Sequence, residues 1–344
     1  MVWQEVADFG GVPASNRRRP KPPVDPRLRA AGRCSPLVGR VKLVAFATSS
    51  SLVRPGALLD ADTVLDLAHP TLALPARGQP NDAYDLAHPF LAAARAAVGR
   101  AADAGQRERW RAAGAVLLRS AVQLHAPVPR PGKILCIGLN YRDHAAEQNA
   151  ELPKRPLLFS KFVTCVQRPE GPIRIPRGST QTDFEAELGV VIGRRAARVA
   201  EADAMRHVLG YCNLHDVSAR DFQFADGQWQ RGKSCDTLAP FGPFVATTDE
   251  IPDPHVLRIR LRLNGTTMQD SNTNQLVFNV PQLIASISAD ITLEPGDVIA
   301  TGTPPGVGCF RKPPIYLKAG DVCEVEVEGL GVLRNPVVAA DATN

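Results

Sequence analysis

The stretch DFEAELGVVIG, residues 183–193, limits the folds open to this chain more than any other. Side chains of a strand alternate between its two faces, and from Val190 onward both faces are apolar. A strand of this kind needs cover on both sides, which predicts a sheet inside a layered core. The same strand begins with three acids spaced two residues apart, Asp183, Glu185 and Glu187, which would share one face.

Carboxylates at the start of a buried strand have two explanations. In the first, the strand end is exposed and water solvates the acids. In the second, the acids are buried around a divalent cation, because buried carboxylates must be paired and neighbouring like charges repel. This stretch alone does not separate the two.

Asp216 is the candidate third ligand beside Glu185 and Glu187, because it follows the apolar stretch VLGYCNLH. Three carboxylates form an all-oxygen set of the kind that Mg²⁺, Mn²⁺ or Ca²⁺ binds. The alternative is that Asp216 caps a helix containing Ser218 and Arg220, and the spacing taken alone favours the cap.

Two further segments carry groups suited to proton transfer and anion stabilisation. In GLNYRDHAAEQ, His144 and Glu147 would be three positions apart on a short helix, an arrangement in which a carboxylate orients an imidazole base. In QWQRGKSCDT, Lys233 would stabilise a developing anion. The common alternatives are a solvent-facing helix and an exposed loop lysine.

The turn ATGTPPGVG is a weaker candidate. Thr301 and Thr303 flank a glycine ahead of two prolines, so the loop can offer hydroxyl and backbone N–H donors to a carboxylate. Most stretches of this composition are simply turns.

Charge and composition exclude several classes of protein. The net charge of +5 lies within residues 1–40, so the body has no net field to attract nucleic acid. No apolar run reaches the length of a membrane span. The seven cysteines have neither CxxC nor zinc spacing, so we expect free thiols in a reducing cytoplasm. A mitochondrial location would follow if the basic tail were a transit peptide.

The chain divides into three parts. Residues 1–40 form a Pro/Arg-rich tail that we expect to be disordered. Residues 41–129 predict a small N-terminal domain, with strands at VKLVAFAT and TVLDLA and helices near 83–102 and 106–121. Residues 130–340 are rich in strands such as LRIRLRLNG, with a further helix at 280–290. The predicted class is α+β, dominated by β-strands.

Several long blocks, in this order, resemble the fumarylacetoacetate hydrolase family: PGKILCIGLNYRDHAAE, DFEAELGVVIG, GYCNLHDVSARDFQ, QWQRGKSCDTLAPFGPF and LEPGDVIATGTPPGVG. The resemblance covers about 131–338 and, more loosely, 41–129. It implies a mixed β-roll catalytic domain behind a small N-terminal α+β domain. It also implies a homodimer that acts on a small oxo-acid, with no membrane or nucleic-acid partner.

The resemblance implies a role for each candidate residue, and the chain departs from the family at none of the metal or dyad positions. It implies Mg²⁺ or Mn²⁺ bound by Glu185, Glu187 and Asp216. The implied catalytic residues are His144, Glu147 and Lys233. The implied substrate contacts are Lys161, Arg220, Gln223 and Thr303.

Three functions remain open at this point. The leading hypothesis is metal-dependent hydrolysis of a C–C bond in a 1,3-dioxo acid such as an acylpyruvate, through a metal-stabilised enolate. The alternative uses the same site without attack by water, as an oxaloacetate decarboxylase or tautomerase or as a 2-hydroxyhepta-2,4-diene-1,7-dioate isomerase. The third is a metal-binding scaffold without turnover, which the presence of His144, Glu147 and Lys233 disfavours.

Overall fold

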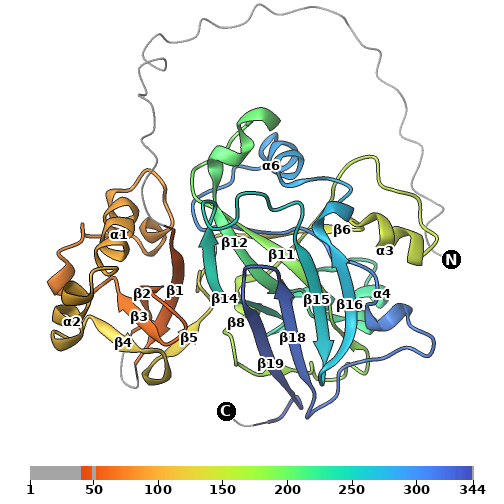
Figure 1. Ribbon diagram of the computed structural model, residues 1–344. Coiled ribbons are helices and arrows are strands. Elements are labelled where there is room, and N and C mark those ends of the chain that lie inside the picture. The colour runs from red at the N-terminus through yellow and green to blue at the C-terminus, as the bar shows by residue number, and fades with distance from the viewer. Residues whose placement is uncertain (1–39, 49–51, 343–344) are drawn as a thin grey trace, which may run out of the picture. The chain divides into compact units, whose positions relative to one another are not determined.

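A computed structural model describes residues 40–48 and 52–342, so the expectation for the tail lies outside the described residues. The predicted α+β class is confirmed (Figure 1). The described helices are α1 (Pro89–Arg100), α2 (Ala104–Ala112), α3 (Arg142–Glu147), α4 (Arg220–Ala225), α5 (Gln230–Ser234) and α6 (Val280–Ser288). The described strands are β1 (Lys42–Ala47), β2 (Arg54–Leu58), β3 (Thr63–Asp66), β4 (Val116–Leu118), β5 (Gln123–His125), β6 (Ile134–Gly138), β7 (Leu157–Lys161), β8 (Val166–Gln167), β9 (Ile173–Arg174), β10 (Thr182–Asp183), β11 (Ala186–Ile192), β12 (Val208–His215), β13 (Ser218–Ala219), β14 (Ala239–Thr247), β15 (Arg258–Leu263), β16 (Thr266–Asn272), β17 (Val298–Ala300), β18 (Val322–Val327) and β19 (Val332–Val338).

The strands form one large mixed sheet and two smaller sheets. Within the described residues, the large sheet has 12 strands, and its main path is β4-β3-β2-β1-β14-β12-β11-β17-β6-β7. A 5-stranded sheet runs β16-β15-β18-β19-β9, and β10 pairs with β13. Most neighbours are antiparallel, whereas β17 and β6 are parallel. The early strands β1–β4 lie toward one end of this sheet, and β6 and β7 lie at the other. The later strands β11, β12, β14 and β17 fill the middle.

Strand β11 lies at the centre of the large sheet between β12 and β17, and every one of its residues is buried. Leu188 and Val190 belong to one apolar cluster, and Val191 belongs to a second cluster on the opposite face. The predicted strand with cover on both sides is therefore confirmed. Burial of each such side chain contributes roughly 1.5–3 kcal/mol, which anchors the strand that carries the acids.

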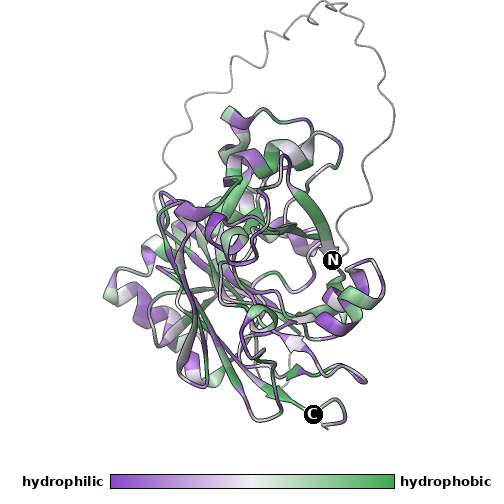
Figure 2. Ribbon diagram, turned by 90° about the vertical axis from the view of Figure 1, so that its right-hand side faces the viewer, coloured by the Kyte–Doolittle hydropathy of each residue, from purple (hydrophilic) through white to green (hydrophobic). Residues whose placement is uncertain are grey.

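The 5-stranded sheet covers one face of this core. Strand β15 alternates between inward Ile259 and Leu261 and outward arginines. The outward Arg260 and Arg262 pair with Glu326 across the sheet. The alternation in LRIRLRLNG therefore predicted this strand and its buried face correctly. Figure 2, coloured by hydropathy, shows hydrophilic and hydrophobic segments succeeding one another along the strands.

The first part of the described chain shares the large sheet, because β1 pairs with β14 through Lys42↔Ala246 and Leu43↔Val245. The described residues, 40–48 and 52–342, belong to one compact unit. The predicted strands are β1 and β3, but the sequence missed β2 between them. Whether 41–129 folds by itself stays a prediction.

The predicted helices in this part are shorter in the structure. Helix α1 begins only at Pro89, after His88 accepts a hydrogen bond from the N–H of Phe90. Helix α2 ends at Ala112, and Gly114 follows with a φ of 80°. A positive φ ends a helix readily at glycine, and the apolar residues beyond it pair with β3 as β4.

The six cysteines among the described residues are free thiols, as expected. Among these residues, no helix is both long and apolar enough to cross a membrane.

Candidate active site

The acids at the start of β11 are buried, so the interpretation as a solvated strand end is wrong. Asp183, Glu185 and Glu187 are 0%, 6% and 1% exposed. Asp216 is also fully buried, and one carboxylate oxygen from each of Glu185, Glu187 and Asp216 lies within 4.8 Å of the other two. The predicted ligand set is therefore brought together in space.

Antiparallel pairing of β11 and β12 explains this meeting. Ala186 pairs with His215, so the residue before β11 lies beside the residue after β12. The backbone N–H of Asp216 donates to the carbonyl of Glu185 at 3.0 Å. The alternative role of Asp216 as a helix cap is wrong, because the residue that precedes α4 is Ala219.

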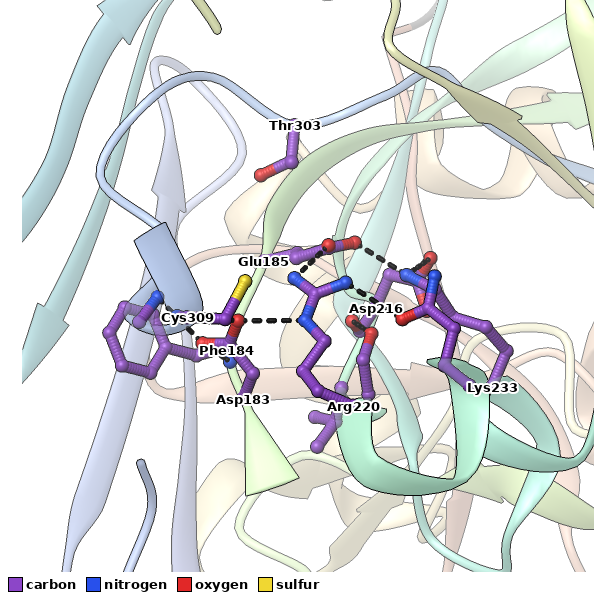
Figure 3. Close-up of polar contacts among 12 residues, drawn as sticks. Asp183, Phe184, Glu185, Asp216, Arg220, Lys233, Thr303 and Cys309 are labelled. Atoms are coloured by element: carbon purple, nitrogen blue, oxygen red, sulfur yellow. Dashed lines mark hydrogen bonds and ion pairs between the residues drawn. The ribbon is translucent and has the colours of Figure 1, made fainter. Parts of the chain in front are cut away.

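Three buried cations surround the carboxylates, and Figure 3 labels two of them, Arg220 and Lys233. Lys161 Nζ lies 2.6 Å from Asp216 Oδ1. Lys233 Nζ lies 2.7 Å from Glu185 Oε2 and 2.9 Å from Asp216 Oδ2. Arg220 contacts the other Glu185 oxygen and donates from Nε to Asp183. The alternative of an exposed loop lysine at Lys233 is therefore wrong.

The electrostatics differ sharply between the two glutamates. Burial alone would raise the pKa of Glu185, but the charges of Arg220 and Lys233 outweigh it and hold that pKa below its usual range. Burial raises the pKa of Glu187 well above its usual range, and the negative charges of Asp216 and Glu185 raise it further. Glu187 Oε2 accepts a hydrogen bond from the backbone N–H of Gly302 at 2.8 Å.

This donor set fits a divalent cation. The cluster has four carboxylates and three cations, so its formal charge is −1. Carboxylate oxygens are the preferred ligands of Mg²⁺ and Mn²⁺. Glu187 is buried without a cation partner among the described residues, and a dication between Glu187, Glu185 and Asp216 would relieve their repulsion.

His144 and Glu147 form the predicted pair on α3. His144 Nδ1 lies 2.9 Å from Glu147 Oε2, and the His144 residue is 6% exposed. The Gln148 amide nitrogen lies 2.8 Å from His144 Nε2. Because an amide N–H only donates, Nε2 accepts this bond and Nδ1 carries the proton that Glu147 accepts. The alternative of an incidental solvent-facing histidine is wrong, since the ring is buried and oriented.

The loop after β17 connects the acids to α3. Gly302 donates its N–H to Glu187, and Gly306 donates its N–H to Glu147 Oε1 at 3.0 Å. Gly302 has a φ of 108°, and a Cβ there would lie 2.8 Å from Asn140 Cβ. Only glycine suits this conformation and this close approach. The imidazole–carboxylate pair and the acid cluster therefore border one loop.

The comparisons with known proteins decide the family. A family model described as "Fumarylacetoacetate (FAA) hydrolase C-terminal" matches residues 133–338. The chain belongs to this fumarylacetoacetate hydrolase family. It is 54% identical to "Oxaloacetate tautomerase fahd2, mitochondrial" of Xenopus laevis over 225 aligned residues. The alignment covers 65% of this chain and 70% of that protein. It is 50% identical to "Oxaloacetate tautomerase FAHD2A, mitochondrial" of Homo sapiens over 65% of this chain and 72% of that protein.

Solved structures share the fold. The 2-hydroxyhepta-2,4-diene-1,7-dioate isomerase from Mycobacterium marinum superposes with a TM-score of 0.66 at 31% identity, over 88% of this chain and 100% of that chain. The fumarylacetoacetate hydrolase from Exiguobacterium antarcticum gives 0.70 at 32% identity, over 87% and 99%. The family fold predicted by the resemblance is therefore confirmed.

The residues that the family resemblance implied as substrate contacts lie around the same cluster. Gln223 is 3% exposed and accepts a hydrogen bond from Arg220 at 3.0 Å. Thr303 is 6% exposed on the loop after β17. The Lys161 side chain is fully buried against Asp216 and the carbonyl of Val217. Their roles toward a substrate remain predictions.

Sequence reasoning missed one buried side chain of this site, Gln269. It lies on β16 and is 1% exposed. The strand sequence TTMQDSN does not alternate between apolar and polar residues, so it carried no signal that Gln269 points inward. Asp183, which is not among the predicted metal ligands, accepts from the N–H groups of Gly308 and Cys309 at 2.7 and 3.1 Å.

Proposed function

We propose that this protein is a Mg²⁺- or Mn²⁺-dependent keto–enol tautomerase of a small 2-oxo diacid, with oxaloacetate as the first substrate to test. The names of two relatives, which are 54% and 50% identical to this chain, support this reaction over C–C bond hydrolysis. Hydrolysis, the leading hypothesis from the sequence, also requires a positioned water, whereas tautomerisation requires only proton transfer.

The observation that carries the proposal is the shared border of the base and the acid cluster. One loop bonds Glu147 through Gly306 and Glu187 through Gly302. Tautomerisation removes a proton from the carbon beside the carbonyl and places a proton on the carbonyl oxygen, so the molecular formula does not change. A base beside a cationic, oxygen-binding site suits both transfers.

His144 would hold the moving proton. Glu147 keeps the proton on Nδ1, which leaves the lone pair of Nε2 as the basic site. The Gln148 amide now donates to that lone pair, so we expect the amide to swing aside when substrate enters. General-base catalysis of this kind accelerates a reaction about 10²–10⁴-fold.

The cations of the cluster would bind the carboxylates of the substrate. Lys233 has three N–H groups and uses two of them, on Glu185 and Asp216. Arg220 has five and uses three, on Asp183, Glu185 and Gln223. A divalent cation bound by the acids would supply a Lewis acid that stabilises negative charge on a substrate oxygen.

Two kinetic assays test the proposal. The first follows the enol absorbance of oxaloacetate as it relaxes to its keto–enol equilibrium, with purified protein and Mg²⁺, with and without EDTA. Acceleration above the buffer rate that EDTA abolishes, without release of pyruvate, supports the tautomerase. Pyruvate and CO₂ from oxaloacetate would support a decarboxylase instead.

The second assay offers acetylpyruvate. Release of pyruvate and acetate would restore the hydrolase hypothesis. The resemblance to a 2-hydroxyhepta-2,4-diene-1,7-dioate isomerase at 31% identity makes that diacid the third substrate to test. Absence of turnover on all three would favour the scaffold without activity.

The oligomeric state and the cellular location of this protein stay proposals. We expect a homodimer, which sedimentation of the purified protein tests. The names of the relatives favour mitochondria over cytoplasm, which imaging of the tagged full chain tests.

A further inference from the structure

Gln269 joins three separate segments at the candidate site. Its Oε1 accepts from the backbone N–H of Ala186 at 2.8 Å, between Glu185 and Glu187. Its Nε2 donates to Thr303 Oγ1 at 2.9 Å and to the carbonyl of Pro304 at 2.8 Å. One amide thus links the acid strand to the loop after β17.

The two backbone partners fix which end of this amide is which. The N–H of Ala186 can only donate, so it requires the amide oxygen. The carbonyl of Pro304 can only accept, so it requires the amide nitrogen. A flipped amide would lose both bonds and leave two buried backbone groups without a partner, which is unfavourable.

This orientation also sets the polarity of the Thr303 hydroxyl. Because Nε2 of Gln269 donates to Oγ1, the hydroxyl accepts from that side and its single proton must point elsewhere. The neighbouring Gly302 contacts Glu187, so Thr303 lies next to the acid cluster, and Figure 3 shows it on the loop near Glu185. The Thr303 hydroxyl can therefore donate its proton to an acceptor other than Gln269.

We propose that Gln269 is a positioning residue that holds Thr303 as a hydrogen-bond donor to a carboxylate of the substrate. The inference rests on the proposed function for the identity of that anion. It assigns Gln269 a part in substrate affinity, whereas the proton transfer remains with His144. In this role Gln269 acts through Thr303 and would contact neither the substrate nor the reacting atoms.

The test compares KM and kcat for oxaloacetate in four variants. Gln269→Leu removes the orienting N–H, and Gln269→Glu replaces it with an acceptor that would capture the Thr303 proton. We expect each to raise KM about tenfold, the value of one hydrogen bond to a charged group, while kcat changes less than about threefold. Thr303→Val should raise KM equally, and Thr303→Ser should restore the wild-type value.

The double variant Gln269→Leu with Thr303→Val decides whether the two residues act together. If Gln269 acts through Thr303, the double variant shows the same KM as either single variant. If the increases in KM multiply instead, Gln269 acts independently of Thr303 and the inference is overturned.

Asn335 provides a matched control for loss of a buried amide. It is 1% exposed on β19 and donates from Nδ2 to the carbonyls of Arg168 and Gly171 at 2.9 and 2.7 Å. Asn335→Leu should lower the melting temperature as Gln269→Leu does, but leave KM unchanged. An equal rise of KM in both would mean that general destabilisation is the cause, and would overturn the inference.

Binding of oxalate separates this inference from the proposed function. Oxalate is a planar dicarboxylate, and calorimetry with Mg²⁺ present measures its affinity without turnover. Wild-type protein that binds oxalate but turns over no oxaloacetate would refute the proposed function. The inference would still stand if Gln269→Leu weakened oxalate binding about tenfold. Equal binding by both proteins, or none by wild type, would overturn it.

Discussion

The backbone N–H of Asp216 donates to the carbonyl of Glu185, and their side chains share the ammonium group of Lys233. This hydrogen bond joins the end of β12 to the start of β11. Pairing of the two strands therefore brings the two carboxylates to the candidate metal site.

Metal binding should stabilise the wild-type protein and should not stabilise Glu187→Gln. A ligand at a hundred times its Kd adds about 2.7 kcal/mol of stability, so Mg²⁺ should raise the wild-type melting temperature and EDTA should reverse it. In EDTA, Glu187→Gln should be at least as stable as wild type, because it removes one of the repelling buried charges. An Mg²⁺-induced rise in the variant as large as in wild type would contradict the assignment of Glu187 as a ligand.

His144→Ala should lower kcat about 10²–10⁴-fold and leave Mg²⁺ affinity unchanged, because the imidazole contacts none of the proposed ligands. Stopped-flow assays give kcat, and calorimetry gives the affinity. If kcat stays within about threefold of wild type while the fold is intact, another group is the base.

Lys161→Met should destabilise the protein by about 3–5 kcal/mol, because it leaves the buried Asp216 without one of its two cations. Urea unfolding measures the free energy. Arg111→Met is the matched control, since its pair with Glu108 is half exposed on α2 and is worth at most about 1 kcal/mol. If both variants lost the same free energy of unfolding, the buried pair of Lys161 and Asp216 would contribute no more stability than an exposed pair.

Stability contributed by Glu147 should depend on pH. Burial raises the pKa of this carboxyl, but the hydrogen bonds from His144 and Gly306 outweigh it and hold the pKa below 4.5. A pKa depressed in the folded state adds stability above the unfolded value, and that stability is lost as pH falls through the folded pKa. Glu147→Gln should therefore melt below wild type at pH 7, and the difference should shrink below about pH 4. A difference that is constant with pH would exclude an ionised Glu147.

The sequence by itself predicted the individual strands and the candidate metal ligands. Alternation identified β15, the apolar run identified β11, and the acid spacing identified Glu185 and Glu187 as candidate ligands, because strand periodicity depends only on neighbouring residues. The length of α2 was predicted less well, since pairing of Val116–Leu118 with β3 competes with helix formation beyond Gly114.

Tertiary structure decided which of the sequence alternatives hold. Spacing favoured Asp216 as a cap, and an exposed loop lysine was the common expectation for Lys233, whereas β11–β12 pairing and burial make them an ion pair beside Glu185. Gln269 had no recognised role until β16 met the loop after β17. Burial, charge pairing and hydrogen-bond direction depend on segments distant in the chain, so the sequence determined the strands and the candidate acids, and the packing of those strands decided what surrounds them.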